Sequence, residues 1–95
     1  MAEERTRAVW RYEVPVDDQW HEVQLGGLGS QPQHVASRRS GIVEFWITQY
    51  EGAPTSARYF RVFGTGHQLE PGIQYVGTAL DGLLVWHLFE KNRLL

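Results

Sequence analysis

The chain has 95 residues, of which 42% are hydrophobic and 13% aromatic, and this is enough apolar surface to close one core in a single domain. It contains no cysteine, which excludes disulfides, thiolate metal sites and cysteine nucleophiles. The formal net charge is −2 and Lys91 is the one lysine, so the chain lacks the strongly basic surface typical of proteins that bind nucleic acid.

The first strand is predicted from an alternation of period two. Trp10, Tyr12, Val14 and Val16 fall on one face, whereas Arg11 and Glu13 fall on the other. This pattern indicates a strand that is buried on one side, and Pro15 marks its edge or its end.

Six further segments have strand character and are separated by turn signals. They are residues 20–25, 34–37, 42–50, 57–63, 73–80 and 83–90. Three glycines and a proline within residues 26–32 interrupt regular structure, residues 38–41 resemble a hairpin turn, and Asp81-Gly82 is a strong hairpin signal. Asp17 and Asp18 are interpreted as turn residues ahead of the second strand.

The composition of two strands predicts their surroundings. Within residues 42–50, the apolar side chains Val43, Phe45 and Ile47 share one face, and the opposite face carries Trp46 between polar neighbours. Residues 83–90 are apolar on both faces, which is typical of a strand in the middle of a sheet.

We therefore predict an all-β fold of six to seven short, mostly antiparallel strands in a small sandwich or partly open barrel. Residues 1–8 are expected to be a flexible leader, residues 9–91 the single β domain, and residues 92–95 a C-terminal tail. The longest apolar run has four residues and there is no signal-peptide pattern, so we expect a cytoplasmic protein without a membrane segment.

The run Gly64-Thr65-Gly66-His67 is the first candidate site. It is not a dinucleotide fingerprint, because Leu69 stands where a third glycine is needed and no helix pattern follows. Two interpretations remain: a bulge or turn that needs glycine for its geometry, or a cradle in which backbone N–H groups, Thr65 and His67 hold a ligand. The geometric interpretation is somewhat favoured.

Other side chains that could take part in ligand binding also have possible structural roles. Trp46 is either part of a second core layer or a stacking platform, and Arg38, Arg39, Arg58 and Arg61 are the candidate cations. The four histidines lack the spacing of a metal-ligand pair, so neither a metal site nor a cofactor is predicted. His87, in the most apolar strand, is expected to be a hydrogen-bonded core histidine.

The segments FRVFGTGH (residues 60–67), YVGTALDG (75–82) and VWHLFE (85–90) resemble a family of small uncharacterised proteins of bacteriophages and bacteria, many of them actinobacteria. The resemblance extends over residues 10–90. The chain departs from the family pattern at Gln68, where proline is common, and at Ile47, where alanine is common. The resemblance implies no particular activity, but small phage-borne domains often act by binding.

The leading hypothesis is a non-enzymatic, homo-oligomeric binding protein that sequesters a small anionic, nucleotide-like signal used in host defence. Its predicted ligand-binding residues are Gly64, Thr65, Gly66, His67, Arg61, Arg38 and Trp46. The alternative is a protein–protein interaction module that inhibits or remodels a host or virion protein through an exposed sheet edge. An enzyme is less expected, because no nucleophile–base or carboxylate pair is visible in the sequence.

Overall fold

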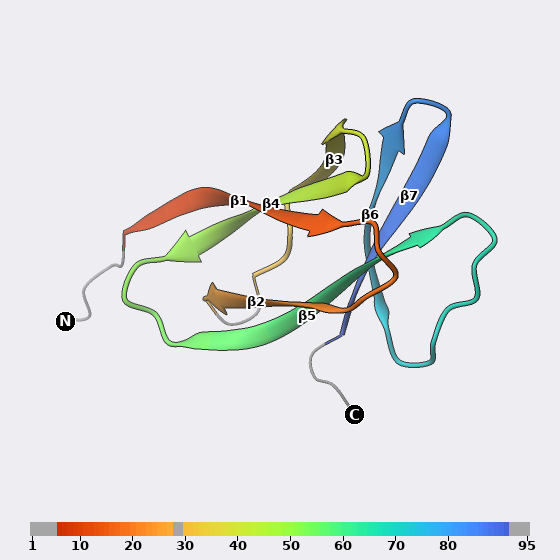
Figure 1. Cartoon of the computed structure of the whole chain (residues 1–95). Coiled ribbons are helices and arrows are strands. Elements are labelled where there is room, and N and C mark those ends of the chain that lie inside the picture. The colour runs from red at the N-terminus through yellow and green to blue at the C-terminus, as the bar shows by residue number, and fades with distance from the viewer. Residues whose placement is uncertain (1–5, 28–29, 92–95) are drawn as a thin grey trace.

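The chain folds into two β-sheets that pack face to face (Figure 1). The computed structural model describes residues 6–27 and 30–91. The strands are β1 (Arg7–Pro15), β2 (His21–Gly26), β3 (His34–Arg39), β4 (Ile42–Tyr50), β5 (Thr55–Gly64), β6 (Gln74–Asp81) and β7 (Leu84–Lys91). One sheet has the order β1-β4-β3 and the other β2-β5-β7-β6, with antiparallel neighbours throughout. The all-β prediction is confirmed, and the architecture is the sandwich.

The N-terminal boundary differs from the expectation. β1 begins at Arg7, so Arg7 and Ala8 belong to a sheet and not to the expected leader. They extend the strand because they continue the pairing with Tyr50 and Gln49 of β4. Residues 1–5 of the expected leader, and the expected tail at 92–95, lie outside the described residues. Within the part of the chain that is described, no helix is long and apolar enough to cross a bilayer.

The core lies between the sheets and follows from side-chain alternation along the strands. Val43, Phe45 and Ile47 are fully buried, as predicted, and the Phe45 ring stacks on Phe60 of β5 with centroids 4.4 Å apart. Each such side chain contributes about 1.5–3 kcal/mol by leaving water. β7 lies between β5 and β6, which confirms its predicted central place, and its Leu88 joins the same core.

Among the described residues, two glutamates are buried, and arginines neutralise both of them. Glu90 of β7 accepts hydrogen bonds from Nε and Nη2 of Arg58 on β5, the second at 2.9 Å. Glu44, on the outer face of β4, accepts from Arg38 of β3 at 2.8 Å and from Arg11 of β1 at 2.6 Å. These bonds, that of Arg38 foremost, lower the pKa of Glu44 to about 2 against the opposing effect of burial. Glu44 thereby fastens both neighbouring strands to β4.

The strands β3 and β6 pack against each other and close one side of the sandwich. Both strands are irregular, with register shifts between Ala36 and Arg39 in β3 and between Tyr75 and Gly77 in β6. Gly77 permits the close approach, because a Cβ at this position would lie 2.5 Å from Cγ2 of Val35.

Asp81, at the end of β6, connects the two sheets on the same side of the sandwich. Its Oδ2 accepts hydrogen bonds from the backbone N–H of Gly41 and the indole N–H of Trp86, both at 3.0 Å. The bond from Trp86, followed by that from Gly41, lowers the pKa of Asp81. The β6–β7 hairpin is thus joined to the β3–β4 turn of the other sheet.

Candidate interaction site at an open sheet edge

The Gly64-Thr65-Gly66-His67 turn folds back on itself. The backbone N–H of Gly64 donates to Nδ1 of His67 at 3.2 Å, and the N–H of His67 donates to the Gly64 carbonyl at 3.2 Å. A Cβ on Gly64 would lie 3.1 Å from the His67 ring, and Gly66 has φ +90°. Glycine therefore meets two geometric demands here: close contact with an imidazole and a left-handed backbone conformation.

Arg61 lies on the outer face of the β2-β5-β7-β6 sheet. Its guanidinium is 4.6 Å from the centre of the Phe63 ring, and Nη1 is 3.5 Å from Oε1 of Glu70. Glu70 also accepts the indole N–H of Trp20 at 2.9 Å and lies 3.4 Å from Nζ of Lys91. The bond from Trp20, followed by that from Lys91, lowers the pKa of Glu70. Arg61 therefore helps to anchor the β5–β6 loop.

Arg38 and Trp46 lie together on the outer face of the other sheet. The guanidinium of Arg38 is 5.4 Å from the centre of the Trp46 ring and also binds Glu44. The centre of the His34 ring lies 5.4 Å from the centre of the Trp46 ring, and the two ring planes are tilted relative to each other. Trp46 is half-buried under these neighbours. The seven predicted ligand residues are consequently divided between opposite outer faces of the sandwich, and one chain does not bring them together.

A hydrogen-bonded chain of side chains runs from the turn across β7 to β6. Thr65 Oγ1 is 2.9 Å from Nε2 of His87, Thr78 Oγ1 is 3.1 Å from its Nδ1, and Tyr75 Oη is 2.6 Å from Thr78 Oγ1. The expectation of a hydrogen-bonded His87 is confirmed, although the ring is half-buried on the outer face of β7 and not in the core. Among the described residues, no three potential metal ligands come together.

The four edge strands of the two sheets differ in how they are protected. β3 and β6 cover each other and carry bulges, which disfavour the addition of another strand. β2 has six residues, and a short strand offers few pairing positions. β1 pairs with β4 over nine residues without a register shift, and it is the long regular edge of the sandwich.

The hydrogen bonds of β1 define which peptide groups face outward. In the same β1–β4 register, Val16 N–H donates to Gly41 O at 2.9 Å and Glu51 N–H donates to Thr6 O at 2.7 Å. Because alternate residues of an antiparallel pair are hydrogen-bonded, the even-numbered residues of β1 face β4. The outward N–H and C=O groups therefore belong to Arg7, Val9, Arg11 and Glu13. Pro15 shares their orientation but has no N–H to offer.

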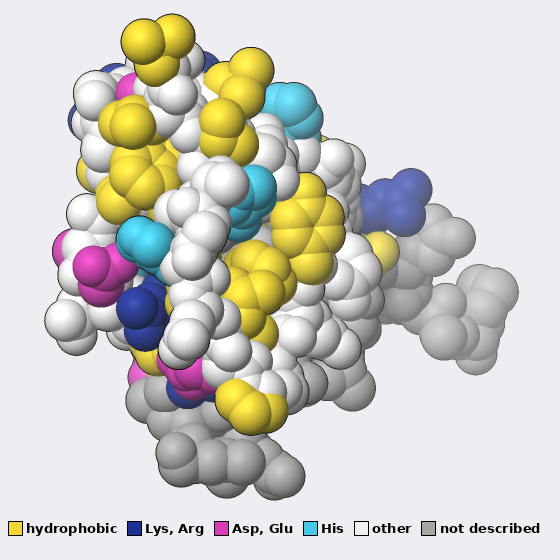
Figure 2. Space-filling view, turned by 90° about the vertical axis from the view of Figure 1, so that its right-hand side faces the viewer, with side chains coloured by type: hydrophobic (Ala, Val, Ile, Leu, Met, Phe, Trp, Pro, Cys, Tyr) yellow, Lys and Arg dark blue, Asp and Glu magenta, His cyan; other side chains and the backbone are white. Residues whose placement is uncertain are grey.

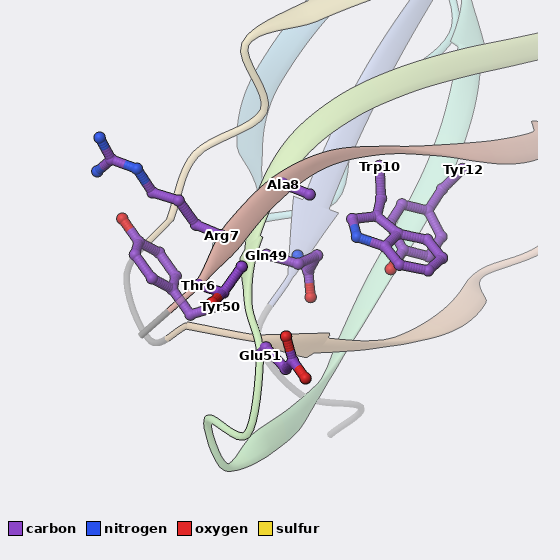
Figure 3. Close-up of a pocket in the computed structure, with 8 residues that line it drawn as sticks. All are labelled: Thr6, Arg7, Ala8, Trp10, Tyr12, Gln49, Tyr50 and Glu51. Carbon is purple, nitrogen blue, oxygen red and sulfur yellow. The ribbon is translucent and has the colours of Figure 1, made fainter. Parts of the chain in front are cut away.

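A cleft of about 460 Å³ opens beneath β1 (Figure 3). It is lined by Thr6, Arg7, Ala8, Trp10, Tyr12, Gln49, Tyr50 and Glu51. Trp10 and Tyr12 form one end of the cleft, and Arg7 and Tyr50 form the other (Figure 3). Trp10 is 57% exposed although it points to the core-facing side of β1, whereas Tyr12 stacks on Phe45 at 5.5 Å and burial raises the pKa of its hydroxyl.

A second apolar surface lies at the tip of the β6–β7 hairpin, where Leu80, Leu83 and Leu84 are exposed. Figure 2, which views the molecule from that side, shows hydrophobic side chains alternating with polar and histidine side chains. The two strands of this hairpin pair with each other, and β7 pairs also with β5. The tip therefore offers apolar side chains without the free run of backbone that β1 has.

The residues of the β1 edge were not predicted as a site, although their pattern was visible. Alternation correctly placed Trp10 and Tyr12 on the core-facing side of the first strand. It did not show that β1 would be an edge strand, because the strand order depends on contacts between distant segments.

The fold and this edge define a small β-sandwich in which one long edge strand, β1, has no second neighbouring strand among the described residues. The chain belongs to a family described as a domain of unknown function, DUF7352, whose model matches residues 5–94. No curated protein and no solved structure matches the chain.

Proposed function

We propose that the chain is a non-enzymatic polypeptide-binding module that accepts an extended segment as an added strand along β1. The observation that carries this proposal is the long, regular and bare edge of β1. Hydrogen bonds to the outward peptide groups of Arg7, Val9, Arg11 and Glu13 would supply affinity for any extended backbone.

The cleft under β1 supports the same function by offering specificity. Alternate side chains of an added strand point to the core-facing side of the sheet, where Trp10, Tyr12 and Ala8 line the cleft. An apolar or aromatic side chain there would bury part of the exposed Trp10 ring, and aromatic residues at such positions often dominate binding energies. In the bacteriophage context that the sequence resemblance implies, the segment would come from a host protein, a virion protein or another copy of the chain.

Peptides selected from a random library against the purified protein test this function. We expect selected peptides to slow hydrogen exchange at the N–H groups of Val9, Arg11 and Glu13. Val9→Pro, which removes one outward N–H, should weaken binding about tenfold or more, whereas Val9→Thr should leave it unchanged. Binding that Val9→Pro does not alter would contradict the proposal.

A small ligand in the cleft is the second candidate, because 460 Å³ and an aromatic lining suit a planar molecule. An anionic group would find Arg7 at one end of the cleft. Native mass spectrometry with a nucleotide mixture that includes cyclic and ADP-ribose-derived species tests the sequestration hypothesis. A retained compound whose binding is lost in Trp10→Ala would favour it, and no retained compound would remove its support.

A further inference from the structure

We infer that the strand which adds to β1 is β1 of a second copy, antiparallel and centred on Trp10. This inference rests on the proposed function of the β1 edge and names its partner. It follows from the order of charges along β1, from the position of Pro15 and from the unexplained exposure of Trp10.

The outward peptide groups limit the registers that a symmetric pair can adopt. Two copies related by a two-fold axis pair outward residues with outward residues, because these residues carry the free N–H and C=O groups. When the axis passes at Trp10, Arg7 lies opposite Glu13 of the second copy, and Val9 lies opposite Arg11. All four outward residues of each copy are then used, and Pro15 lies beyond the paired segment.

Neighbouring registers lose either a hydrogen bond or charge complementarity. An axis at Arg11 places the two Arg11 side chains opposite each other, and an axis at Val9 places Arg7 opposite Arg11, so like charges face each other in both cases. An axis at Tyr12 places Val9 opposite Pro15, which cannot donate. The Trp10-centred register is favoured because it places opposite charges across from each other at both ends of the paired segment.

This pairing also accounts for the open cleft. Because the peptide groups of Trp10 face β4, Trp10 on the axis forms a non-hydrogen-bonded pair with Trp10 of the second copy, and side chains approach closely in such a pair. The two Trp10 side chains would therefore meet on the core-facing side, and each would cover part of the other copy's cleft. The β1-β4-β3 sheets of the two copies would merge into one continuous sheet, which removes the last long unprotected edge.

The size of the protein in solution, measured by light scattering across a micromolar concentration series, gives the first test. We expect a concentration-dependent dimer. Val9→Pro removes two hydrogen bonds from each dimer and should raise its Kd about 30-fold, whereas Val9→Thr, which keeps the N–H, should not. A dimer that is insensitive to Val9→Pro uses another surface and overturns the inference.

The order of charged residues along β1 allows the register of the β1–β1 pair to be tested with two complementary variants. Arg7→Glu places two glutamates opposite each other at both ends of the dimer, and Glu13→Arg places two arginines there, so each variant alone should be monomeric. Mixed together, the two variants should form a heterodimer, because the glutamate introduced in one chain faces the arginine introduced in the other. Failure of the mixture to associate, with circular dichroism showing both variants folded, excludes this register.

The results separate this inference from the proposed function. A wild-type protein that remains monomeric at all concentrations, yet binds library peptides that Val9→Pro binds more weakly, overturns the second-copy inference and leaves strand addition intact. If Val9→Pro affects neither dimerisation nor peptide binding, both proposals are wrong.

Discussion

The two sides of the sandwich differ in how their edge strands are covered. On one side, β3 and β6 each carry a bulge, pack on each other across Gly77, and are joined at their ends through Asp81. On the other side, β1 pairs with β4 over nine residues without a register shift, and no other strand of the described residues pairs with its outer edge. A small domain that had to avoid association would be expected to protect both sides alike.

The difference is informative because β1, on the open side, is well packed in its own sheet. Arg11 binds the buried Glu44, and Tyr12 stacks on Phe45, so β1 is firmly held in its sheet. What it leaves exposed is the outward backbone, together with Val9 at 55% and Trp10 at 57% exposure. A firmly held strand with a bare edge is typical of a binding surface and not of a frayed terminus.

The largest effect is expected on the closed side, where a single methyl group would separate the strands. Gly77→Ala would place a Cβ 2.5 Å from Val35 Cγ2, and we expect it to lower the free energy of unfolding by about 2–3 kcal/mol. In a Val35→Ala background, the same substitution should cost less, because Cγ2 is gone, but part of the cost should remain, since Cβ of residue 35 would still lie 2.8 Å from the new Cβ. Urea denaturation of the four proteins measures this coupling. Equal costs in both backgrounds would show that contact with Val35 does not cause the loss.

The next effect concerns Glu44, which links the two sides through Arg11 of β1 and Arg38 of β3. The pKa of Glu44 is lowered to about 2 from 4.5, so its stabilisation is present above pH 4.5 and is lost as the pH falls from about 4.5 to about 2. Because both arginines are partly solvated, we expect a contribution of about 1–2 kcal/mol.

Glu44→Gln isolates this contribution. Relative to the wild type, the variant should be less stable at pH 7 and nearly equal in stability at pH 2. Thermal unfolding across this pH range measures the difference. A deficit that stays constant with pH would show that packing, and not ionisation, accounts for the effect.

Much of this architecture could be predicted from sequence, because alternation is a local property. The buried set Val43, Phe45 and Ile47 and the central position of the last strand are both confirmed. β1 begins at Arg7, two residues before the predicted start of the domain at Val9. Its first residues carry no apolar pattern, and their pairing with the end of β4 is a tertiary contact.

The candidate site was less predictable for the same reason. In sequence, the glycines of the Gly64–His67 turn fit both a conformational role and a ligand cradle. Only the structure shows that the His67 ring occupies the space over Gly64. Arg38 and Arg61 could not be assigned to opposite faces without knowing that their strands belong to different sheets.

A smaller effect on the closed side is expected at Asp81. The pKa of this carboxyl is lowered by its bonds from Trp86 and Gly41, so its stabilisation is present above the ordinary aspartate pKa and declines as the pH falls below it. Asp81→Ala should lower Tm by a few degrees at pH 7 and speed hydrogen exchange at the Gly41 N–H. Trp86→Phe, which removes the indole N–H donor and keeps a smaller aromatic ring, should have part of the effect on Gly41 exchange. Unchanged exchange at Gly41 would show that the two hairpins are held by other contacts.

The smallest effect on folding, and the sharpest contrast with the closed side, is expected at Trp10. Since more than half of this side chain is exposed, Trp10→Ala should change the free energy of unfolding of the monomer by only about 0.5 kcal/mol. Tyr12→Ala, two residues along the same face, should cost about 2–3 kcal/mol, because it removes the ring stacked on Phe45. Both measurements belong in the Val9→Pro background at low protein concentration, where strand addition is weakened and folding of the monomer is observed. A large loss of stability in Trp10→Ala under these conditions would mean that Trp10 belongs to the core, and the open side would then lose its main exposed anchor.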